Sequence, residues 1–311
     1  MLSQENKEKL IDSGYRIVGP NSHSAVEVCR WTKKSMLDEG FCYKQKFYEG
    51  IHGIQSHRCL QMTPSLPFCD NRCMFCWRNV EISETQWEGE TDDPESILNE
   101  AVEAQRKLLS GFKGNPEANI EKWREAQNPT LCAISLDGEP TLYPKINGLI
   151  EECKRREITP FLVTNGQHPN ILESLEEPAQ LYISAVAPDK KTYSKICRPQ
   201  LPDYWERLKR SLEVLPSLEC VKVLRLTLVD GWNLRDPSGY ASLIDKAEPD
   251  FVEPKGYMFV GHSRKRLKKR NMPDHKKIKD FSARISDLTG YEIVDESEAS
   301  RVCLLSRTGR Y

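Results

Sequence analysis

Three cysteines in one short stretch, Cys69, Cys73 and Cys76, are the residues of this chain best suited to chemistry. Their spacing, C-x3-C-x2-C, allows the thiolates to converge on one iron–sulfur cluster. A four-iron cluster needs four ligands, and this stretch supplies three. One iron is then open to a ligand that is not protein, and an open position distinguishes a catalytic metal centre from a structural one.

The aromatic residue before the last cysteine, Phe75, narrows the interpretation. In the radical S-adenosylmethionine (SAM) superfamily the pattern reads C-x3-C-x-aromatic-C, and this stretch resembles it at every defined position. The resemblance implies a [4Fe–4S] cluster that binds SAM. The alternative is a structural zinc knuckle that takes a fourth ligand from elsewhere in the chain.

Composition describes an ordinary globular chain. It has 311 residues with 38% hydrophobic residues, and 45 basic against 46 acidic residues give a formal charge of −1. Net charge therefore predicts no partner, and a nucleic-acid surface would need local clustering of cations. The first residues lack an apolar signal region, and no apolar run could span a bilayer. We expect a cytoplasmic, monomeric protein with reduced thiols and no membrane partner.

Short apolar runs alternate with helical stretches from residue 59 onward, which is typical of a parallel sheet built from βα units. Helices are expected at Pro94–Leu109, Lys145–Arg156, Pro169–Glu176, Tyr204–Leu215 and Pro237–Ala247. The strand candidates are Cys59–Ser65, Leu131–Leu136, Thr159–Thr164, Leu181–Val186, Val221–Val229 and Phe251–Tyr257.

Six βα units are fewer than the eight of a closed TIM barrel. We therefore predict an α/β fold, a partial (β/α)6 TIM-like barrel of the radical-SAM type with N-terminal and C-terminal extensions. The expected domains are an N-terminal extension (1–57) that carries part of a second cluster site, the barrel (58–260), and a basic C-terminal extension (261–311). Within the two extensions we expect a helix over Ser24–Leu37 and a strand over Arg301–Ser306. Within the barrel, residues 111–130 are expected to form a polar insertion on the surface.

Polar residues follow the expected strands, where a cofactor would bind at the carboxyl ends of a parallel sheet. Gly138 permits close approach of a ligand, and Glu139 can accept hydrogen bonds from an ammonium group. The superfamily carries a Gly-Gly-Glu-Pro-like stretch here that contacts the amino group of SAM, and this chain has Asp137 at the first position. The other candidate SAM-binding residues are Phe75, Thr164, Asn165 and Ser184. Taken singly, Asp-Gly and Asn-Gly are also common turn formers.

Several further motifs make the chain resemble the 4-demethylwyosine synthase family. They include three upstream cysteines and the stretches Asp137–Pro144, Leu224–Val229 with Gly231–Asn233, and Glu253–Tyr257. The resemblance covers about Cys29 to Leu267. By spacing alone, Cys29, Cys42 and Cys59 could be three unconnected thiols. The resemblance implies that they hold a second [4Fe–4S] cluster.

The same resemblance implies the reaction and its partners. The substrates are pyruvate and a phenylalanine tRNA that carries 1-methylguanosine beside the anticodon. A SAM-derived radical takes hydrogen from the N1-methyl group, and the carbon radical adds to pyruvate to form the tricyclic base. The chain resembles the archaeal form, which needs an external one-electron donor.

Lys44, two residues after Cys42, is the candidate catalytic residue. The carbonyl of a 2-oxo acid forms a Schiff base with a neutral amine, and neighbouring aromatic residues could desolvate this lysine. The family's proposed Schiff-base lysine lies beside the second cluster cysteine, which matches Lys44. Lys46 is the second candidate, and an RNA-facing or solvated lysine is the plain alternative.

A basic run near the C-terminus is the candidate RNA-binding segment, because clustered cations pair with phosphates without regard to sequence. A solvated helix face is the alternative. Trp77, Trp87 and Tyr257 could each stack on an exposed base, and the sequence does not choose between them. The candidate RNA-binding residues are Arg264, Lys265, Arg266, Lys268, Lys269 and Arg270.

Two other functions remain open from the sequence. One is a different radical-SAM enzyme that modifies RNA. The other is a non-catalytic iron–sulfur or zinc protein that binds RNA or transfers electrons, against which the polar strand ends argue.

Overall fold

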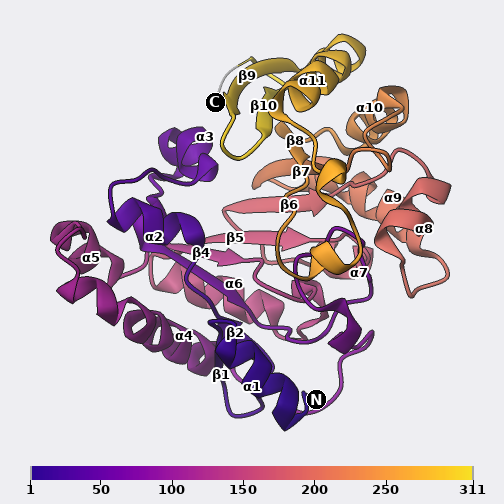
Figure 1. The fold of residues 1–311 in the computed structure, drawn as a ribbon. Helices are drawn as coiled ribbons and strands as arrows, with labels where there is room; N and C mark the ends of the chain where they lie inside the picture. Colours follow the sequence, from indigo (N-terminus) through magenta and orange to yellow (C-terminus); the bar gives the residue numbers. More distant parts are fainter. Residues whose placement is uncertain (1, 310–311) are drawn as a thin grey trace. The chain divides into compact units, whose positions relative to one another are not determined.

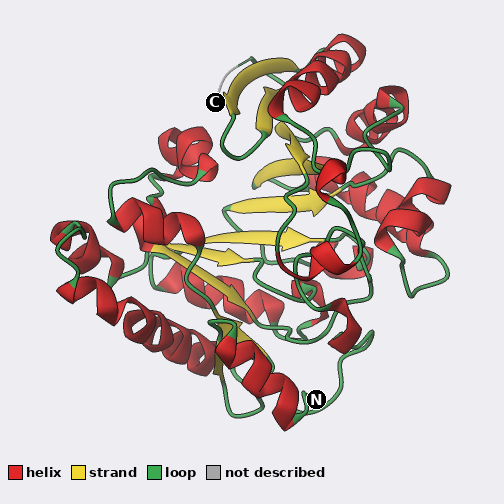
Figure 2. Ribbon diagram, in the orientation of Figure 1, coloured by secondary structure: helices red, strands yellow, loops and turns green. Residues whose placement is uncertain are grey.

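The computed structural model describes residues 2–309 (Figures 1 and 2). These residues divide into two compact units. Unit 1 comprises residues 2–69, Gln86–Val163 and Glu176–Ala179. Unit 2 comprises Asp70–Thr85, Thr164–Leu175 and residues 180–309. Each unit is described below by itself.

Unit 1 is built on five paired strands. β3 (Cys59–Thr63), β4 (Leu131–Ile134) and β5 (Thr159–Thr164) pair in parallel, as the apolar runs predict. β1 (Arg16–Val18) pairs antiparallel with β2 (Ser24–Val26), and β2 pairs antiparallel with β3. Continuous burial of β4 explains why its sequence is wholly apolar.

The helices of unit 1 cover and extend these strands. α4 begins at Pro94 after Asp93, whose carboxylate accepts a hydrogen bond from the amide of Glu95, a usual N-terminal cap. α4 packs against α6 in this unit. The helices are α1 (Gln4–Asp12), α2 (Arg30–Met36), α3 (Tyr43–His52), α4 (Pro94–Leu109), α5 (Ile120–Ala126) and α6 (Ile146–Arg155).

Two expectations for unit 1 are wrong. Ser24–Leu37 is not one helix, because its first three residues form β2 between β1 and β3 and the helix begins only after Cys29. Residues 111–130 are more than a polar excursion. They contain α5, and Ala126 joins Met36 and Leu109 in a buried apolar cluster that also receives Trp123.

Unit 2 also has five paired strands. β6 (Gln180–Ser184), β7 (Val221–Leu228) and β8 (Phe251–Gly256) pair in parallel. β10 (Val302–Ser306) lies antiparallel between β8 and β9 (Glu292–Ser297). The sequence does not signal β9, because half of its Glu-Ile-Val-Asp-Glu-Ser residues are acidic and none of the six is buried.

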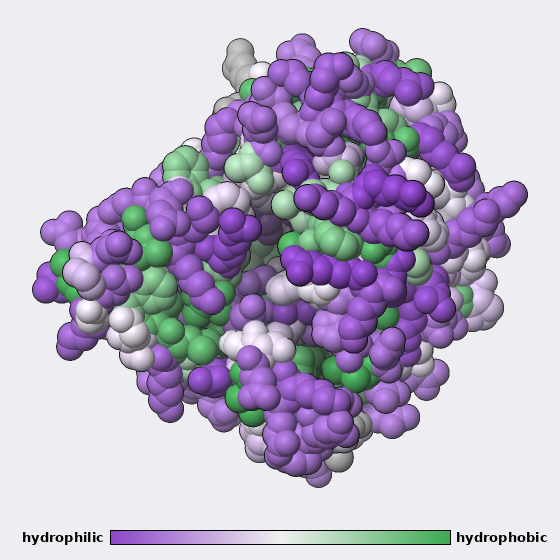
Figure 3. Space-filling model, in the orientation of Figure 1, coloured by the Kyte–Doolittle hydropathy of each residue, from purple (hydrophilic) through white to green (hydrophobic). Residues whose placement is uncertain are grey.

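The helices of unit 2 are α7 (Pro169–Leu172), α8 (Lys190–Cys197), α9 (Tyr204–Val214), α10 (Pro237–Ala247) and α11 (His275–Thr289). α11 packs on β8 and β10 (Figure 1) and buries Ile278, Phe281 and Ile285. The visible surface over α11 and β9 is mainly hydrophilic (Figure 3). Within residues 2–309, no helix is long and apolar enough to cross a membrane.

Candidate active site

The loop with the three cysteines follows β3. Cys69 ends the first segment of unit 1, whereas Cys73 and Cys76 belong to unit 2, and all three are partly exposed. In unit 2 the loop runs along the end of α8. The amide of Arg72 donates to the carbonyl of Cys197 at 2.9 Å, and the amide of Met74 donates to that of Ile196 at 2.8 Å. The backbone of α8 therefore holds the residues around Cys73 in place.

The donor set of this loop fits an iron–sulfur cluster. A hydrogen bond with the Cys197 thiol and burial raise the pKa of Cys73 well above its usual range. Thiolate sulfur is the ligand of iron–sulfur clusters, and a bound metal takes the place of the thiol proton. Cys197, which is not among the sequence-predicted site residues, therefore contacts a candidate ligand.

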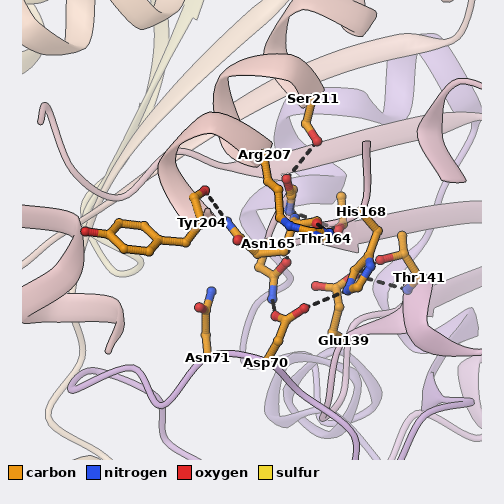
Figure 4. A network of polar contacts seen from close by, with 12 residues as sticks. Asp70, Asn71, Glu139, Thr141, Thr164, Asn165, His168, Tyr204, Arg207 and Ser211 are labelled. Atoms are coloured by element: carbon orange, nitrogen blue, oxygen red, sulfur yellow. Dashed lines mark hydrogen bonds and ion pairs between the residues drawn. The ribbon is translucent and has the colours of Figure 1, made fainter. Parts of the chain in front are cut away.

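A polar network in unit 2 holds the start of the loop (Figure 4). Asp70 is fully buried, and its carboxylate accepts a hydrogen bond from Asn165 Nδ2 at 2.6 Å. Its second oxygen lies 2.6 Å from Nε2 of His168. Asn71 donates to the hydroxyl of Tyr193 at 3.1 Å. The Asn165 amide thus braces the loop.

Asp70 and His168 are not among the sequence-predicted site residues. The available signal was their position, since Asp70 follows a candidate ligand and His168 follows the Asn-Gly turn after β5. Of the other unit 2 candidates, Thr164 is buried and accepts from the amide of Gly166 at 3.1 Å. Ser184 ends β6 and is partly exposed.

In unit 1, Gly138 and Glu139 lie against the residues before Cys69. Gly138 has φ +68°, and a β-carbon there would lie 2.4 Å from the carbonyl oxygen of Ser65 and 2.7 Å from that of Phe68. Only glycine fits this position without displacing the backbone. The amide of Glu139 donates to the Phe68 carbonyl at 2.7 Å. The Asp137–Glu139 turn therefore supports the start of the cysteine loop.

The Glu139 side chain is held in a fixed orientation. It is almost fully buried, and Oε1 accepts hydrogen bonds from the Thr141 amide at 3.1 Å and the Thr141 hydroxyl at 2.7 Å (Figure 4). Asp137, the departure from the Gly-Gly pattern, accepts a hydrogen bond from the Tyr15 hydroxyl at 3.1 Å. The carboxylate at position 137 thereby binds a tyrosine of the N-terminal segment.

The three upstream cysteines and Lys44 line one cavity of unit 1, which measures about 350 Å³ including its open mouth. Cys29 precedes α2, Cys42 precedes α3, and Cys59 begins β3. Burial, and then the neighbouring Cys29 and Cys42, raise the pKa of Cys59 far above its usual value. The three thiols are therefore close enough to interact, and this donor set fits a second metal cluster.

A serine fixes the walls of this cavity, and sequence reasoning missed it. Buried Ser56 accepts from the Cys42 amide at 2.8 Å and donates its hydroxyl to Gln45 Oε1 at 2.8 Å. Its carbonyl accepts from the Thr32 hydroxyl at 2.9 Å. The starts of α2 and α3 are thus tied to the turn before β3. Lys44 Nζ lies 5.3 Å from the centre of the Phe161 ring, and Lys46 is exposed.

The basic run of unit 2 is not one helix. It forms two short 3-10 turns, Gly261–Lys265 and Lys269–Asn271, and most of its cations are exposed. Arg266 is the exception, because its guanidinium contacts the backbone of the cysteine loop. The exposed cations are Arg264, Lys265, Lys268, Lys269 and Arg270.

The three stacking candidates differ in exposure. Tyr257 is buried, and its hydroxyl is hydrogen-bonded to that of Ser263. Trp87 packs on Phe68 at a ring distance of 4.6 Å in unit 1. Trp77 has 38% of its surface exposed. Trp77 is the most exposed of the three, although the Arg78 guanidinium covers one face of its ring.

Parallel βα units together with a C-x3-C-x2-C loop after β3 define a radical-SAM protein. The radical SAM superfamily matches residues 63–244, and the wyosine base formation family matches residues 246–307. S-adenosyl-L-methionine-dependent tRNA 4-demethylwyosine synthase of Pyrococcus horikoshii is 51% identical over 98% of this chain and 90% of its own length. The enzyme of the same name from Oryza sativa is 41% identical, and the chain spans 47% of its length.

Solved structures agree with the sequence comparison. A structure of TYW1 with a lysine–pyruvate adduct bound has a TM-score of 0.89 and 35% identity, and covers 100% of this chain and 98% of that chain. A crystal structure of archaeal TYW1 has a TM-score of 0.81 and 32% identity with the same coverage. The chain belongs to the tRNA 4-demethylwyosine synthase family, and it is a radical-SAM enzyme of wyosine synthesis. Membership implies SAM and a [4Fe–4S] cluster, and confirms the predicted fold class.

Proposed function

We propose that this enzyme condenses 1-methylguanosine, next to the anticodon of a phenylalanine tRNA, with pyruvate to form 4-demethylwyosine. The observation that supports this best is the unit 1 cavity, where Lys44 lies with Cys29, Cys42 and Cys59. A relative of 35% identity holds a lysine–pyruvate adduct, and a lysine amine is the group that forms a Schiff base with the carbonyl of a 2-oxo acid.

In this proposal Cys69, Cys73 and Cys76 hold the SAM-binding cluster. They lie within eight consecutive residues, so the chain itself keeps the three thiols near one another. Such a cluster, with one open iron, would supply the electron for reductive cleavage of SAM, which provides the radical that takes hydrogen from the methyl group of the substrate base.

The residues of the chain orient the cofactor and keep the loop rigid. Gly138 lets the turn after β4 approach Ser65 and Phe68, just before Cys69, and Glu139 is fixed so that it can accept a hydrogen bond from the SAM ammonium group. Phe75, Thr164, Asn165 and Ser184 complete the proposed SAM site, with Asn165 acting through Asp70.

We assign pyruvate to the unit 1 cavity. Lys44 would bind it as a Schiff base, losing water as the C=N bond forms. Cys29, Cys42 and Cys59 would hold a second [4Fe–4S] cluster beside it, and the partly exposed thiols and open mouth leave access for the tRNA base. The carbon radical of the base would add to the Schiff-base carbon there, and the carboxyl group would leave as CO2 with its odd electron passing to the second cluster. The exocyclic amine of the base would then displace the Lys44 amine as the third ring closes.

The exposed cations Arg264, Lys265, Lys268, Lys269 and Arg270 would bind tRNA phosphates. We further propose that the enzyme acts as a cytoplasmic monomer with an external one-electron donor, and that residues 1–57 and 261–311 extend a barrel of residues 58–260.

The deciding experiment is anaerobic incubation of the reconstituted protein with dithionite, SAM, pyruvate and tRNA containing 1-methylguanosine, followed by nucleoside mass spectrometry. We expect the mass of 4-demethylwyosine, with label incorporated from ¹³C-pyruvate. Unchanged 1-methylguanosine alongside SAM cleavage would contradict the proposed substrates. Methyl transfer to the tRNA would indicate another RNA-modifying reaction.

A further inference from the structure

Arg266 lies within the basic run, but its side chain is directed at protein rather than solvent. It is partly buried, whereas Lys265 and Lys268 on either side are exposed. Its Nε donates to the carbonyl of Met74 at 3.3 Å, and Nη2 donates to the carbonyl of Cys76 and to that of Arg78 at 3.5 Å. One guanidinium thus binds three backbone carbonyls on and around a candidate cluster ligand.

The backbone near Arg266 holds the same loop. The amide of His262 donates to the carbonyl of Trp77 at 2.8 Å. Gly261 has φ +55°, and a β-carbon there would lie 2.3 Å from the oxygen of Trp77. The segment 261–266 therefore lies against the loop, and Gly261 approaches the Trp77 carbonyl so closely that only glycine fits at that position.

This segment is itself fixed to the core of unit 2. Ser263 is fully buried, and its hydroxyl is hydrogen-bonded to the hydroxyl of Tyr257 at 2.8 Å. Leu267 is also buried. The backbone that carries Arg266 is consequently rigid. The planar guanidinium of Arg266 can hold several carbonyl groups in one geometry.

We propose that Arg266 is a positioning residue that clamps the loop Met74–Arg78, and that it is not a phosphate-binding cation. The inference goes beyond the proposed function but rests on it in one respect, namely that Cys73 and Cys76 ligate the cluster. A fixed cation beside the Cys76 carbonyl would also stabilise the reduced, more negative cluster, because charge and hydrogen bonds near the sulfurs set the potential.

The first test uses the apoprotein and hydrogen–deuterium exchange of residues 73–78. Arg266→Ala should accelerate exchange of these amides by roughly tenfold, because charge-assisted hydrogen bonds to the loop are lost. Arg266→Lys keeps the positive charge but lacks the planar guanidinium, so its exchange rate should lie between those of Arg266→Ala and the wild type. Lys268→Ala and Lys269→Ala, exposed neighbours in the same run, should leave the exchange unchanged.

The second test uses reconstituted protein. In Arg266→Ala the electron paramagnetic resonance spectrum of the SAM-bound cluster should change and the midpoint potential should fall, while tRNA affinity and its salt dependence stay near wild type. Lys268→Ala should show the reverse pattern. Gly261→Ala would displace the Trp77 carbonyl without altering charge, and it should reproduce the faster amide exchange. This variant keeps the test decisive if Arg266→Ala fails to fold.

Wild-type exchange and spectrum in Arg266→Ala, with weaker tRNA binding, would overturn the proposal and return Arg266 to the phosphate contacts. Unchanged exchange in Gly261→Ala would equally overturn the clamp. Apoprotein exchange does not depend on any cluster. If Cys73→Ala keeps its cluster while Arg266→Ala still loosens the loop, the proposed ligands fail and the clamp does not.

Discussion

The carboxylate of Asp70 lies 2.6 Å from Nε2 of His168, a residue 98 positions further along the chain. Asp70 is fully buried in unit 2, and the His168 side chain is 18% exposed. Because Asp70 is the neighbour of Cys69, this contact fixes the backbone at the start of the cysteine loop. A buried carboxylate that loses a partner is costly, so the pair is strongly constrained.

His168→Ala should lower the free energy of unfolding by about 1–3 kcal/mol, because it removes one hydrogen bond from the buried Asp70. Retention of iron during chelator challenge should fall as well. Urea unfolding of the apoprotein and iron analysis measure the two effects. His275→Ala is the matched control, since His275 at the start of α11 pairs with Glu296 of β9 at 3.1 Å, outside the loop. Equal iron retention in the two variants would show that His168 does not support the loop.

Gly138→Ala should abolish SAM binding and destabilise unit 1, because its β-carbon would meet the Ser65 carbonyl at 2.4 Å. Gly53→Ala is the control. Gly53 has a similar φ of +63° but nothing within 4 Å of an added β-carbon, so it isolates the backbone strain, about 1 kcal/mol. Equilibrium dialysis with labelled SAM and thermal unfolding are the measurements. Equal losses of SAM binding and of thermal stability in both variants would show that the close approach of the backbone at Gly138 is not required.

Cys69→Ala, Cys73→Ala and Cys76→Ala should each abolish reductive SAM cleavage, because each removes one of three proposed protein ligands. Release of 5′-deoxyadenosine is the readout. Cys220→Ala, at a partly exposed cysteine outside both groups, should behave like the wild type. Wild-type turnover in any of the three variants would contradict the assignment of the catalytic cluster.

The triple variant Cys29→Ala, Cys42→Ala, Cys59→Ala should lose half of the iron bound after reconstitution and still cleave SAM. It should make no tricyclic base, because the cavity would lack its second cluster. Iron and sulfide analysis beside nucleoside mass spectrometry test this. Unchanged iron content would leave these cysteines as three neighbouring thiols.

Borohydride with labelled pyruvate should trap an adduct on Lys44, found by peptide mass spectrometry. Lys44→Ala should lose the adduct and the product while still cleaving SAM. Lys46→Ala is the matched control, because Lys46 is exposed on the same helix whereas Lys44 lines the cavity. An adduct that survives in Lys44→Ala would move the Schiff base elsewhere, first to Lys46.

Replacing Lys265, Lys268, Lys269 and Arg270 together by alanine should weaken tRNA binding and flatten its salt dependence. Loss of about four phosphate contacts changes the slope of log K against log salt by roughly 3–4 units. Lys277→Ala with Lys279→Ala is the control, since these lysines are ion-paired with Asp230 and Glu296. Filter binding across a salt series measures both. Identical slopes would make the basic run a solvated surface.

The sequence by itself determined the fold class and the family. Parallel strands that are buried on both faces must be short apolar runs, so β4 is visible as such in the chain. The cysteine spacing is equally local, because its chemistry depends on residues within one loop. These features need no knowledge of distant contacts.

Only the tertiary structure decided which residues meet across long separations. Arg266 contacts the carbonyl of Cys76, 190 positions earlier, although its sequence neighbourhood predicts a phosphate contact. Charge type and spacing do not say which way a side chain points, because burial and backbone direction set that orientation. The common cavity of Cys29, Cys42 and Cys59 has the same origin, since it depends on where α2, α3 and β3 begin in space and not on spacing along the chain.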